Sequence, residues 1–343
     1  MSVTGALYRK YRPQTFAEVR DQDHIVTVLE GAIRKGEIPH AILFSGGRGT
    51  GKTTLARIFA KAIGTSDIDL YEIDAASNRG IDDVRELKEA VHTMPYESPQ
   101  KVYIIDEVHM LTKEAFNALL KTLEEPPAHV VFILATTEEE KLLDTILSRC
   151  QVFRMHLPSR AVLVEIVTDV AKQEGFKLSP DAADLIAIAA DGSFRDALGV
   201  TQKVIMASGD KIGSADEVAA IIGAPKTATM LELVRALQFK DREAALLAVA
   251  TAVEGKVDMK LFARLLLEHV RAVMLLRNLP SRKAEILGSF GIEAQQKLEE
   301  YARGATPLNS HMLLRLLQAT ELIGRSPIPQ APLEIAIIEV TES

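Results

Sequence analysis

Short apolar runs alternate with amphipathic stretches over the first half of the chain. Residues 53–63 (TTLARIFAKAI) carry apolar side chains at helical spacing. Strand-like runs are predicted at 41–45 (AILFS), 70–74 (LYEID), 102–106 (VYIID) and 130–136 (VVFILAT). This alternation predicts a parallel sheet with right-handed crossovers, so the carboxyl ends of the strands meet at one edge.

The second half is predicted to be all-α. From about Pro158 the strand pattern gives way to amphipathic helices such as 181–190 and 259–276, whose apolar stripes we expect to form cores. The Gly/Pro-marked stretch IIGAPKTAT places a boundary near Gly223 to Thr227. We therefore expect an α/β domain followed by two helical domains, with bounds 1–157, 158–224 and 225–343.

Composition narrows the class of protein. The chain has 343 residues, 47% of them hydrophobic and 25% charged, which is ordinary for a globular protein. No apolar run approaches the roughly 18 to 20 residues of a membrane span, and no signal-peptide core is present, so we expect a cytoplasmic protein. Cys150 is the single cysteine, which excludes intrachain disulfides. With a net charge of −7 the surface is not basic overall, so any contact with nucleic acid must come from a local cluster of basic residues.

The stretch FSGGRGTGKTT (44–54) has the spacing G-x-x-x-x-G-K-[ST] of a phosphate-binding loop. A predicted strand precedes it and a predicted helix follows, which favours this interpretation over a glycine-rich turn with an incidental lysine. Lys52 is expected to reach the β- and γ-phosphates, and Thr53 to bind Mg²⁺. The candidate nucleotide-binding residues are Gly46, Gly47, Arg48, Gly49, Thr50, Gly51, Lys52, Thr53 and Thr54.

Two carboxylates, Asp106 and Glu107, end the run VYIIDE at the same expected edge. We expect Asp106 to hold Mg²⁺ through its water shell and Glu107 to orient or deprotonate an attacking water. The alternative is a solvated acidic pair, which the phosphate loop upstream disfavours. His109, close by, is interpreted as a packing residue.

Hydroxyl and guanidinium groups complete the set of candidates. Thr136 and Thr137 end the run VVFILATT, where a hydroxyl could contact the attacking water or the γ-phosphate. Arg149 and Arg195 suit charge stabilisation in phosphoryl transfer because the guanidinium stays charged. Taken as isolated residues, both arginines are interpreted as surface residues.

Taken together and in this order, several motifs resemble the gamma/tau subunits of bacterial DNA polymerase III, the ATPases of the sliding-clamp loader. The motifs are GGRGTGKT, IIDEVHML, FNALLKTLEEPP, LATTEEEKLLDTILSRC and GSFRDAL, after an opening YRKYRPQTFAEVRDQDHI. The resemblance implies an AAA+ domain, a small helical lid and a helical collar. It also implies a pentameric ring with delta, delta-prime and further gamma copies, which acts on the beta clamp and on primed DNA.

The resemblance also implies individual roles. Arg149 matches the arginine finger of the SRC motif, which reaches ATP bound by a neighbouring subunit. Arg195 matches the second sensor, which reaches the γ-phosphate in its own subunit, and Thr137 is our choice for the first sensor. The residues that match the box framing the adenine are Arg12, Pro13 and Val19.

This chain departs from the family in two ways. The family carries a four-cysteine zinc module between the phosphate-loop helix and the next strand, whereas this chain has GTSDID there. We therefore expect ATP and Mg²⁺ as cofactors and no zinc. The chain also stops about where the collar is expected to end, without the tau-type extension.

DNA contact is expected to involve the phosphate backbone. Asn78 and Arg79 could meet a phosphate at a helix N-terminus, without reading bases. The same residues equally fit an ordinary helix cap, with Asp82 and Asp83 in the first turn. The sequence leaves both interpretations open.

Two other functions compete with a hydrolysing loader subunit. A structural subunit resembling delta-prime would have a degraded phosphate loop, whereas Gly51, Lys52 and Thr53 are intact here. A Holliday-junction branch-migration ATPase would carry a C-terminal winged helix, which the helical pattern of this chain does not suggest.

Overall fold

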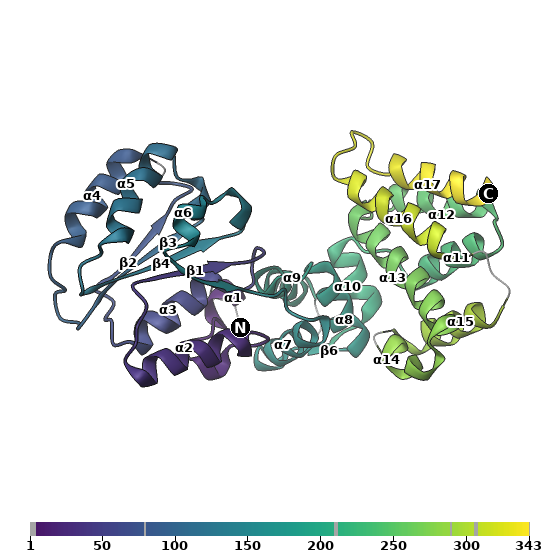
Figure 1. Ribbon diagram of the computed structural model, residues 1–343. Helices are drawn as coiled ribbons and strands as arrows, with labels where there is room; N and C mark the ends of the chain where they lie inside the picture. Colours follow the sequence, from purple (N-terminus) through teal and green to yellow (C-terminus); the bar gives the residue numbers. More distant parts are fainter. Residues whose placement is uncertain (1–4, 79, 209–211, 289, 305–307, 343) are drawn as a thin grey trace. The chain divides into compact units, whose positions relative to one another are not determined.

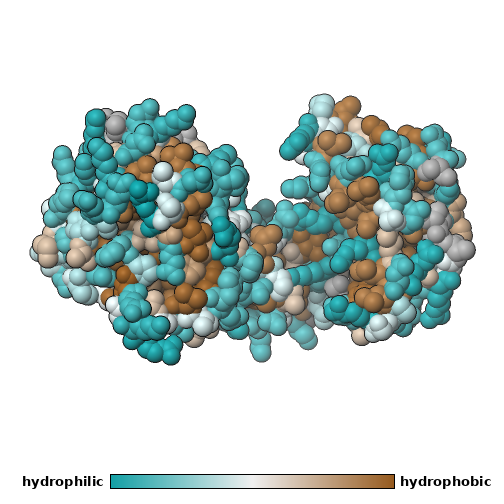
Figure 2. Space-filling view, viewed as in Figure 1, coloured by the Kyte–Doolittle hydropathy of each residue, from teal (hydrophilic) through white to brown (hydrophobic). Residues whose placement is uncertain are grey.

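A computed structural model describes residues 5–78, 80–208, 212–288, 290–304 and 308–342 (Figure 1). The chain divides into two compact units. One holds the chain up to Leu163 together with Gly192–Asp196, and the other holds Val164–Asp191 and the chain from Ala197 onward. On the surface of each unit, apolar patches show between hydrophilic residues (Figure 2).

The first unit is built on a five-stranded parallel sheet with strand order β2-β3-β4-β1-β5. In chain order the strands are β1 Ala41–Ser45, β2 Leu70–Asp74, β3 Lys101–Asp106, β4 Val130–Thr136 and β5 Gln151–Arg154. The predicted parallel sheet and its four strands are confirmed, although β3 starts one residue earlier than expected. The edge strand β5 was not predicted because it is short and only Phe153 is buried.

Helices cover both faces of this sheet (Figure 1). Leu43 and its neighbours in the sheet pack with α4 (Ile81–Val91), α5 (Lys113–Glu124) and α6 (Asp144–Leu147). Ile42 and Phe44 pack with α2 (Asp23–Lys35) and α3 (Lys52–Ala62), as the two-residue period of a strand requires. The helical elements are α1 Leu7–Lys10, η1 Phe16–Glu18, α2 Asp23–Lys35, α3 Lys52–Ala62, α4 Ile81–Val91, η2 Val108–Met110, α5 Lys113–Glu124, η3 Glu139–Lys141 and α6 Asp144–Leu147.

The second unit is almost entirely helical. The predicted helical architecture is confirmed, with the addition of two short strands, β6 Lys177–Leu178 and β7 Ile212–Gly213, which pair in parallel. Isolated two-residue strands leave no periodic signal in the sequence. The helical elements are α7 Arg160–Gln173, α8 Pro180–Ala189, α9 Phe194–Ala207, α10 Ala215–Ile222, α11 Thr227–Gln238, α12 Arg242–Glu254, α13 Met259–Asn278, η4 Pro280–Arg282, α14 Lys283–Leu287, α15 Ile292–Arg303, α16 Ser310–Ile323 and α17 Ala331–Glu342.

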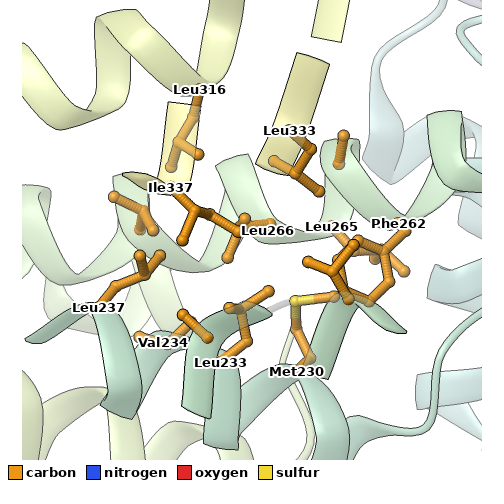
Figure 3. Close-up of a cluster of buried hydrophobic side chains, with 14 of the residues drawn as sticks. Met230, Leu233, Val234, Leu237, Phe262, Leu265, Leu266, Leu316, Leu333 and Ile337 are labelled. Atoms are coloured by element: carbon orange, nitrogen blue, oxygen red, sulfur yellow. The ribbon is translucent and has the colours of Figure 1, made fainter. Parts of the chain in front are cut away.

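The long helix α13 forms the centre of the helical core. Phe262, Leu266, Val270 and Val273 repeat every three or four residues and are fully buried. Figure 3 shows side chains of α11, α13, α16 and α17 pointing toward one another in this cluster. The interpretation of these apolar stripes as core is confirmed.

One expected boundary coincides with a break between helices. Helix α10 ends at Ile222 and is followed by Gly223, whose φ of 72° is left-handed, and α11 starts at Thr227. The compact units do not separate the expected lid from the expected collar, because residues on both sides of Gly223 share one core. The boundaries at 157/158 and 224/225 stay predictions.

Candidate active site

Glycines shape the loop that joins β1 to α3. Gly46, Gly49 and Gly51 hold φ angles of 152°, 74° and 106°. A Cβ atom on Gly46 would lie 2.7 Å from the carbonyl oxygen of Met155, and one on Gly49 would lie 2.0 Å from Ser193 Oγ. A side chain at either position would force Met155 or Ser193 to shift, so the tight turn at the start of α3 favours glycine.

Lys52 opens α3 with a side chain that is almost fully buried. Its Nζ donates to the carbonyl oxygens of Gly46 and Gly47, each at 2.8 Å. Burial lowers the pKa of Lys52, while the negative charges of Glu107 and Asp106 raise it and Arg195 lowers it further. The lysine therefore stands within electrostatic reach of the two acids and of Arg195.

Thr53 and Asp106 lie side by side at the carboxyl ends of the strands. Thr53 Oγ1 donates to Asp106 Oδ2 at 2.7 Å, and Asp106 Oδ1 accepts from the backbone N–H of Glu107 at 3.0 Å. A hydroxyl and a carboxylate next to a phosphate loop are the oxygen ligands that Mg²⁺ uses in such sites. This donor set fits the ion that the sequence predicts here.

Glu107 adopts a left-handed backbone conformation, with φ 49°. Such a conformation is uncommon for a residue other than glycine. Its Oε2 accepts from the backbone N–H of Thr137 at 3.3 Å and from Thr137 Oγ1 at 2.9 Å. Strands β3 and β4 are neighbours, so the end of one strand brings the carboxylate to the threonine at the end of the other.

His109 lies between these two strand ends. Its side chain is only 5% exposed, as packing requires, but both ring nitrogens meet polar groups. Nδ1 lies 2.9 Å from Thr136 Oγ1 and 3.5 Å from Glu107 Oε2, and Nε2 lies 2.9 Å from Glu138 Oε2. The sequence pattern did not predict this bridge. The signal available in the sequence was that the motifs DEVH (106–109) and TTEE (136–139) follow two predicted strands and carry the contacting residues Glu107, Thr136 and Glu138.

Arg195 lies in a segment that contacts the phosphate loop. Phe194 donates its backbone N–H to the carbonyl oxygen of Gly49 at 3.0 Å, and Ser193 lies against the same glycine. The Arg195 guanidinium carbon lies 5.7 Å from the centre of the Tyr8 ring, a cation–π distance. Sequence reasoning missed Ser193 and Tyr8, although Tyr8 belongs to the aromatic and basic run YRKY.

Arg149 is held apart from this cluster. Its guanidinium forms an ion pair with Glu124 at 2.5 Å and donates to the carbonyl oxygen of Thr145 at 2.7 Å. Both side chains of the ion pair are partly exposed. Across the described residues, no hydrogen bond or ion pair joins Arg149 to 46–53.

The three residues expected near the adenine occupy two places. Arg12 and Pro13 line a cavity of about 200 Å³ together with Arg57 and Glu72, which form a bidentate ion pair. The residues 46–51 do not line this cavity. Val19 instead packs partly buried against the core formed by α2, α3 and the sheet.

The predicted DNA-contact stretch follows β2. The Asn78 side chain donates to the carbonyl oxygen of Asp74 at 3.0 Å, and Asp74 in turn accepts from the backbone N–H of Ala76 and from the Ser77 hydroxyl. This is a local turn closed on Asp74, in which the Asn78 amide acts as a donor to a carbonyl oxygen. Both sequence interpretations of Asn78, DNA contact and helix cap, stay predictions. Arg79 lies outside the described residues.

A short connection between α3 and β2 stands where the family's zinc module is expected. Asp69 in this connection accepts from the backbone N–H groups of Tyr96, Glu97 and Ser98 at 2.6, 3.0 and 2.8 Å. In the part of the chain that the structure describes, no cluster of three or more His, Cys, Asp or Glu could hold a metal ion. The absence of zinc stays a prediction. None of the described helices is long and apolar enough to cross a membrane.

Comparison with known protein families adds independent evidence. Residues 64–159 match the model of the DNA polymerase III delta subunit, and 163–210 match the ATPase lid domain of a DNA polymerase III clamp loader subunit. The chain is 38% identical to DNA polymerase III subunit tau of Salmonella typhimurium, over 98% of this chain and 54% of that protein. It is also 38% identical to subunit tau of Bacillus subtilis, over 87% of this chain and 55% of the relative.

The chain belongs to the DNA polymerase III gamma/tau family. A gamma/tau subunit of Mycobacterium tuberculosis is 35% identical over 87% of this chain and 55% of its own length. The chain therefore spans about half the length of these gamma/tau relatives.

Solved structures show that this member of the gamma/tau family has the AAA+ fold. The RuvB Holliday junction branch migration motor of Thermotoga maritima matches with a TM-score of 0.54 and 21% identity, over 67% of this chain and 80% of that chain. At this identity the likeness concerns the fold alone.

Proposed function

We propose that this chain is an ATP-hydrolysing subunit of the DNA polymerase III clamp loader. ATP binding would hold the ring-shaped beta clamp open around primed DNA, and hydrolysis would release it. The observation that carries the proposal is the hydrogen bond between Thr53 and Asp106 next to the buried Lys52, in a chain of the gamma/tau family. Placing Mg²⁺ ligands beside a phosphate-binding lysine serves phosphoryl transfer.

The phosphate chain of ATP would bind to the loop 46–54. Lys52 donates two of its three N–H groups to loop carbonyl oxygens, and its charge would offset that of the β- and γ-phosphates. Thr53 and Asp106 would hold Mg²⁺, with Asp106 acting through the water shell. A bound ion would supply positive charge that offsets the charge developing on the phosphates.

Glu107 would orient or deprotonate the attacking water. Its carboxylate shares a hydrogen bond with Thr137, which supports Thr137 as the first sensor, a residue that links the state of the γ-phosphate to the catalytic acid. Arg195 would act as the second sensor, and the contact between its segment and Gly49 supports this role. Arg12, Pro13 and Val19 would frame the adenine.

Arg149 would act on the ATP of a neighbouring subunit. Among the described residues, its guanidinium bonds to Glu124 and Thr145 and not to its own phosphate loop. Because the ion pair with Glu124 is partly exposed, the guanidinium is accessible to another protein surface. A finger supplied in trans makes hydrolysis depend on assembly, with a contribution to the rate on the order of 10³ to 10⁵.

Assembly would use the helices after residue 225 as a collar, in a pentameric ring with delta, delta-prime and further gamma copies. Helices α16 and α17 carry large apolar side chains that are exposed, namely Leu314, Leu317, Ile335 and Ile338. Exposed apolar residues in pairs on neighbouring helices favour a protein interface. DNA would be contacted through its backbone.

The alternatives are less well supported. The matched delta-subunit model covers 64–159 and does not include the phosphate loop, whose glycines and Lys52 are intact. A structural role without hydrolysis would not require these residues. The likeness to a branch migration motor concerns the fold alone.

The test is steady-state ATP hydrolysis by the chain alone and in a mixture with the other loader subunits, clamp and primed DNA. We expect low activity alone and strong stimulation in the mixture. Lys52→Ala is expected to lose activity in both settings. Arg149→Ala is expected to lower the stimulated rate by about 10³-fold. Arg154→Ala is the matched control, because Arg154 is a similarly paired surface arginine on β5, bound to Glu139.

Two results would contradict the proposal. Hydrolysis that is high for the chain alone and unaffected by clamp, primed DNA or Arg149→Ala would mean that another AAA+ machine uses this fold. A rate that Lys52→Ala leaves unchanged would mean that the phosphate loop is not the hydrolytic site.

A further inference from the structure

His109 connects two turns that otherwise belong to different strands. Its own turn, η2, follows β3 and Glu107, while Thr136 is the last residue of β4 and Glu138 lies in the turn that follows it. The ring lies within 2.9 Å of both Thr136 Oγ1 and Glu138 Oε2. It is therefore a polar bridge from the turn of the proposed catalytic acid to the turn of the proposed first sensor.

One arrangement of hydrogens satisfies every group in this bridge. The backbone N–H of Glu138 donates to Thr136 Oγ1 at 3.0 Å, which leaves the threonine hydroxyl free to donate to His109 Nδ1. A ring with its hydrogen on Nε2 then donates to Glu138 Oε2 at 2.9 Å. This tautomer fixes the orientation of the ring, because Nδ1 accepts one hydrogen bond and Nε2 donates the other.

The far end of the bridge is also anchored. Glu138 Oε1 forms an ion pair with Lys141 Nζ at 2.7 Å, so the carboxylate is held from both sides. Burial of His109 to 5% exposure keeps water from competing with these hydrogen bonds. A ring used for packing alone would need neither the anchored carboxylate nor the threonine.

Thr137 lies between the two residues that the ring contacts on the β4 turn. The ring nitrogen Nδ1 lies 3.5 Å from Glu107 Oε2 and, carrying no hydrogen in this tautomer, makes no hydrogen bond to it. Thr137 Oγ1 donates to the same oxygen, and this hydrogen bond links the turn to the carboxylate. Movement of the β4 turn relative to η2 would therefore move the Glu107 carboxylate. Glu107 also has a left-handed backbone conformation, which is unfavourable for a residue with a side chain. Contacts with neighbouring residues must therefore stabilise it.

We propose that His109 is a positioning residue for Glu107. The ring sets the separation between η2 and the Thr136–Glu138 turn, and through Thr137 this separation fixes the carboxylate that orients the attacking water. The inference rests on the proposed ATPase function and adds to it a residue that touches neither substrate nor metal.

The test measures kcat and KM for ATP in the reconstituted loader, with His109→Ala, His109→Asn and His109→Gln. Asn places its amide near Nδ1 and Gln places its amide near Nε2, so each keeps one end of the bridge. We expect His109→Ala to lower kcat by about 10- to 100-fold with KM nearly unchanged, because a misplaced catalytic group costs rate rather than affinity. The Asn and Gln variants should recover part of the rate.

Two further measurements separate positioning from stability. Binding of a fluorescent ATP analogue to each variant reports whether the phosphate loop is intact. In a double-mutant cycle, Glu138→Ala should lower kcat much less in a His109→Ala background than in the unsubstituted chain. His129→Ala is the matched control, because its partly buried ring bonds to the carbonyl oxygens of Val91 and Thr93, away from the catalytic cluster.

The outcomes are distinguishable. Unchanged kcat in His109→Ala, or a loss of kcat that His109→Asn and His109→Gln share in full while ATP binding falls equally, would overturn the positioning role. Additive effects of the His109 and Glu138 substitutions would also overturn it. An unsubstituted loader that binds ATP but does not hydrolyse it would instead contradict the proposed function, and the positioning role with it.

Discussion

The two ends of the parallel sheet both hold buried charges, but they use them differently. At the amino ends, Asp69 accepts from three backbone N–H groups, and Lys101 donates to the carbonyl oxygens of Ala90 and Thr93 and to the Thr93 hydroxyl. Both side chains are almost fully buried. Each of these charged side chains binds backbone groups of a neighbouring loop and so fixes that loop to the sheet.

At the carboxyl ends, polar side chains bond mainly to one another. Thr53 donates to Asp106, Thr137 donates to Glu107, and His109 bridges the two turns. The backbone also takes left-handed conformations here, at Gly49, Gly51 and Glu107. Burial of charge alone thus does not identify a functional site. We propose that mutual bonding of side chains next to a phosphate loop is what distinguishes the functional end of the sheet.

The strongest way to test this contrast is to replace the buried lysine at each end with methionine. Lys52→Met is expected to lower the rate of ATP hydrolysis by about 10²- to 10³-fold, as loss of a charge-stabilising donor does, with little change in stability. Hydrolysis assays and urea denaturation followed by circular dichroism measure the two effects. Lys61→Met, an exposed lysine on the same helix, is the control.

Lys101→Met is expected to do the reverse. It removes three hydrogen bonds from a buried cationic donor to Ala90 and Thr93, so the free energy of unfolding should fall by about 3 kcal/mol. Hydrolysis per folded molecule should stay near that of the unsubstituted chain. Loss of hydrolysis in folded Lys101→Met, or unfolding of Lys52→Met, would break the contrast.

A smaller effect is expected from Asp69→Asn. Burial raises the pKa of the Asp69 carboxyl, but hydrogen bonds from the backbone of Tyr96, Glu97 and Ser98 outweigh it and lower the pKa to about 2, against an ordinary 3.8. Because the pKa is lower in the folded state, the carboxylate contributes to the free energy of unfolding above pH 3.8, and this contribution is lost as the pH falls toward 2. Asp69→Asn should lower the free energy of unfolding by about 2 kcal/mol near neutral pH.

In Asp69→Asn, the free energy of unfolding should depend less on pH between pH 3.8 and about pH 2 than it does in the unsubstituted chain. Urea denaturation midpoints measured from pH 7 down to pH 2 test this, and Asp67→Asn, on an exposed residue of the same connection, is the control. An equal loss of stability at every pH would show that the negative charge of Asp69 is not what holds the loop.

The smallest effect is expected from Gly49→Ala. The left-handed backbone at Gly49 costs an alanine roughly 1 to 2 kcal/mol, and the added methyl group would meet Ser193 Oγ. We expect affinity for ATP to fall by about tenfold, in line with that cost. Ser193→Gly in the same chain should restore part of it by removing the clash.

Fluorescent ATP-analogue titration measures this loss of affinity. Gly31→Ala is the control, because Gly31 lies in α2 with open space around it and alanine favours a helix there. Full affinity in Gly49→Ala would mean that the loop does not need the left-handed turn to bind phosphate.

Much of the α/β unit could be predicted from local pattern. Four strands and the phosphate loop with its helix follow from runs of apolar residues and from glycine spacing, because both are properties of neighbouring residues. The edge strand β5 could not be predicted in this way, since its residues are mostly exposed and its pairing with β1 is a contact between distant segments.

The sequence by itself determined which residues could perform the chemistry. The loop 46–54, Asp106, Glu107 and Thr137 were identified by their order and by their place at strand ends. The tertiary structure decided how these residues meet. Strand order makes β3 and β4 neighbours, so Glu107 bonds to Thr137 and His109 reaches Glu138. The segment Gly192–Asp196 brings Ser193 onto Gly49. Such contacts depend on strand pairing and crossovers between distant segments, which no local pattern encodes.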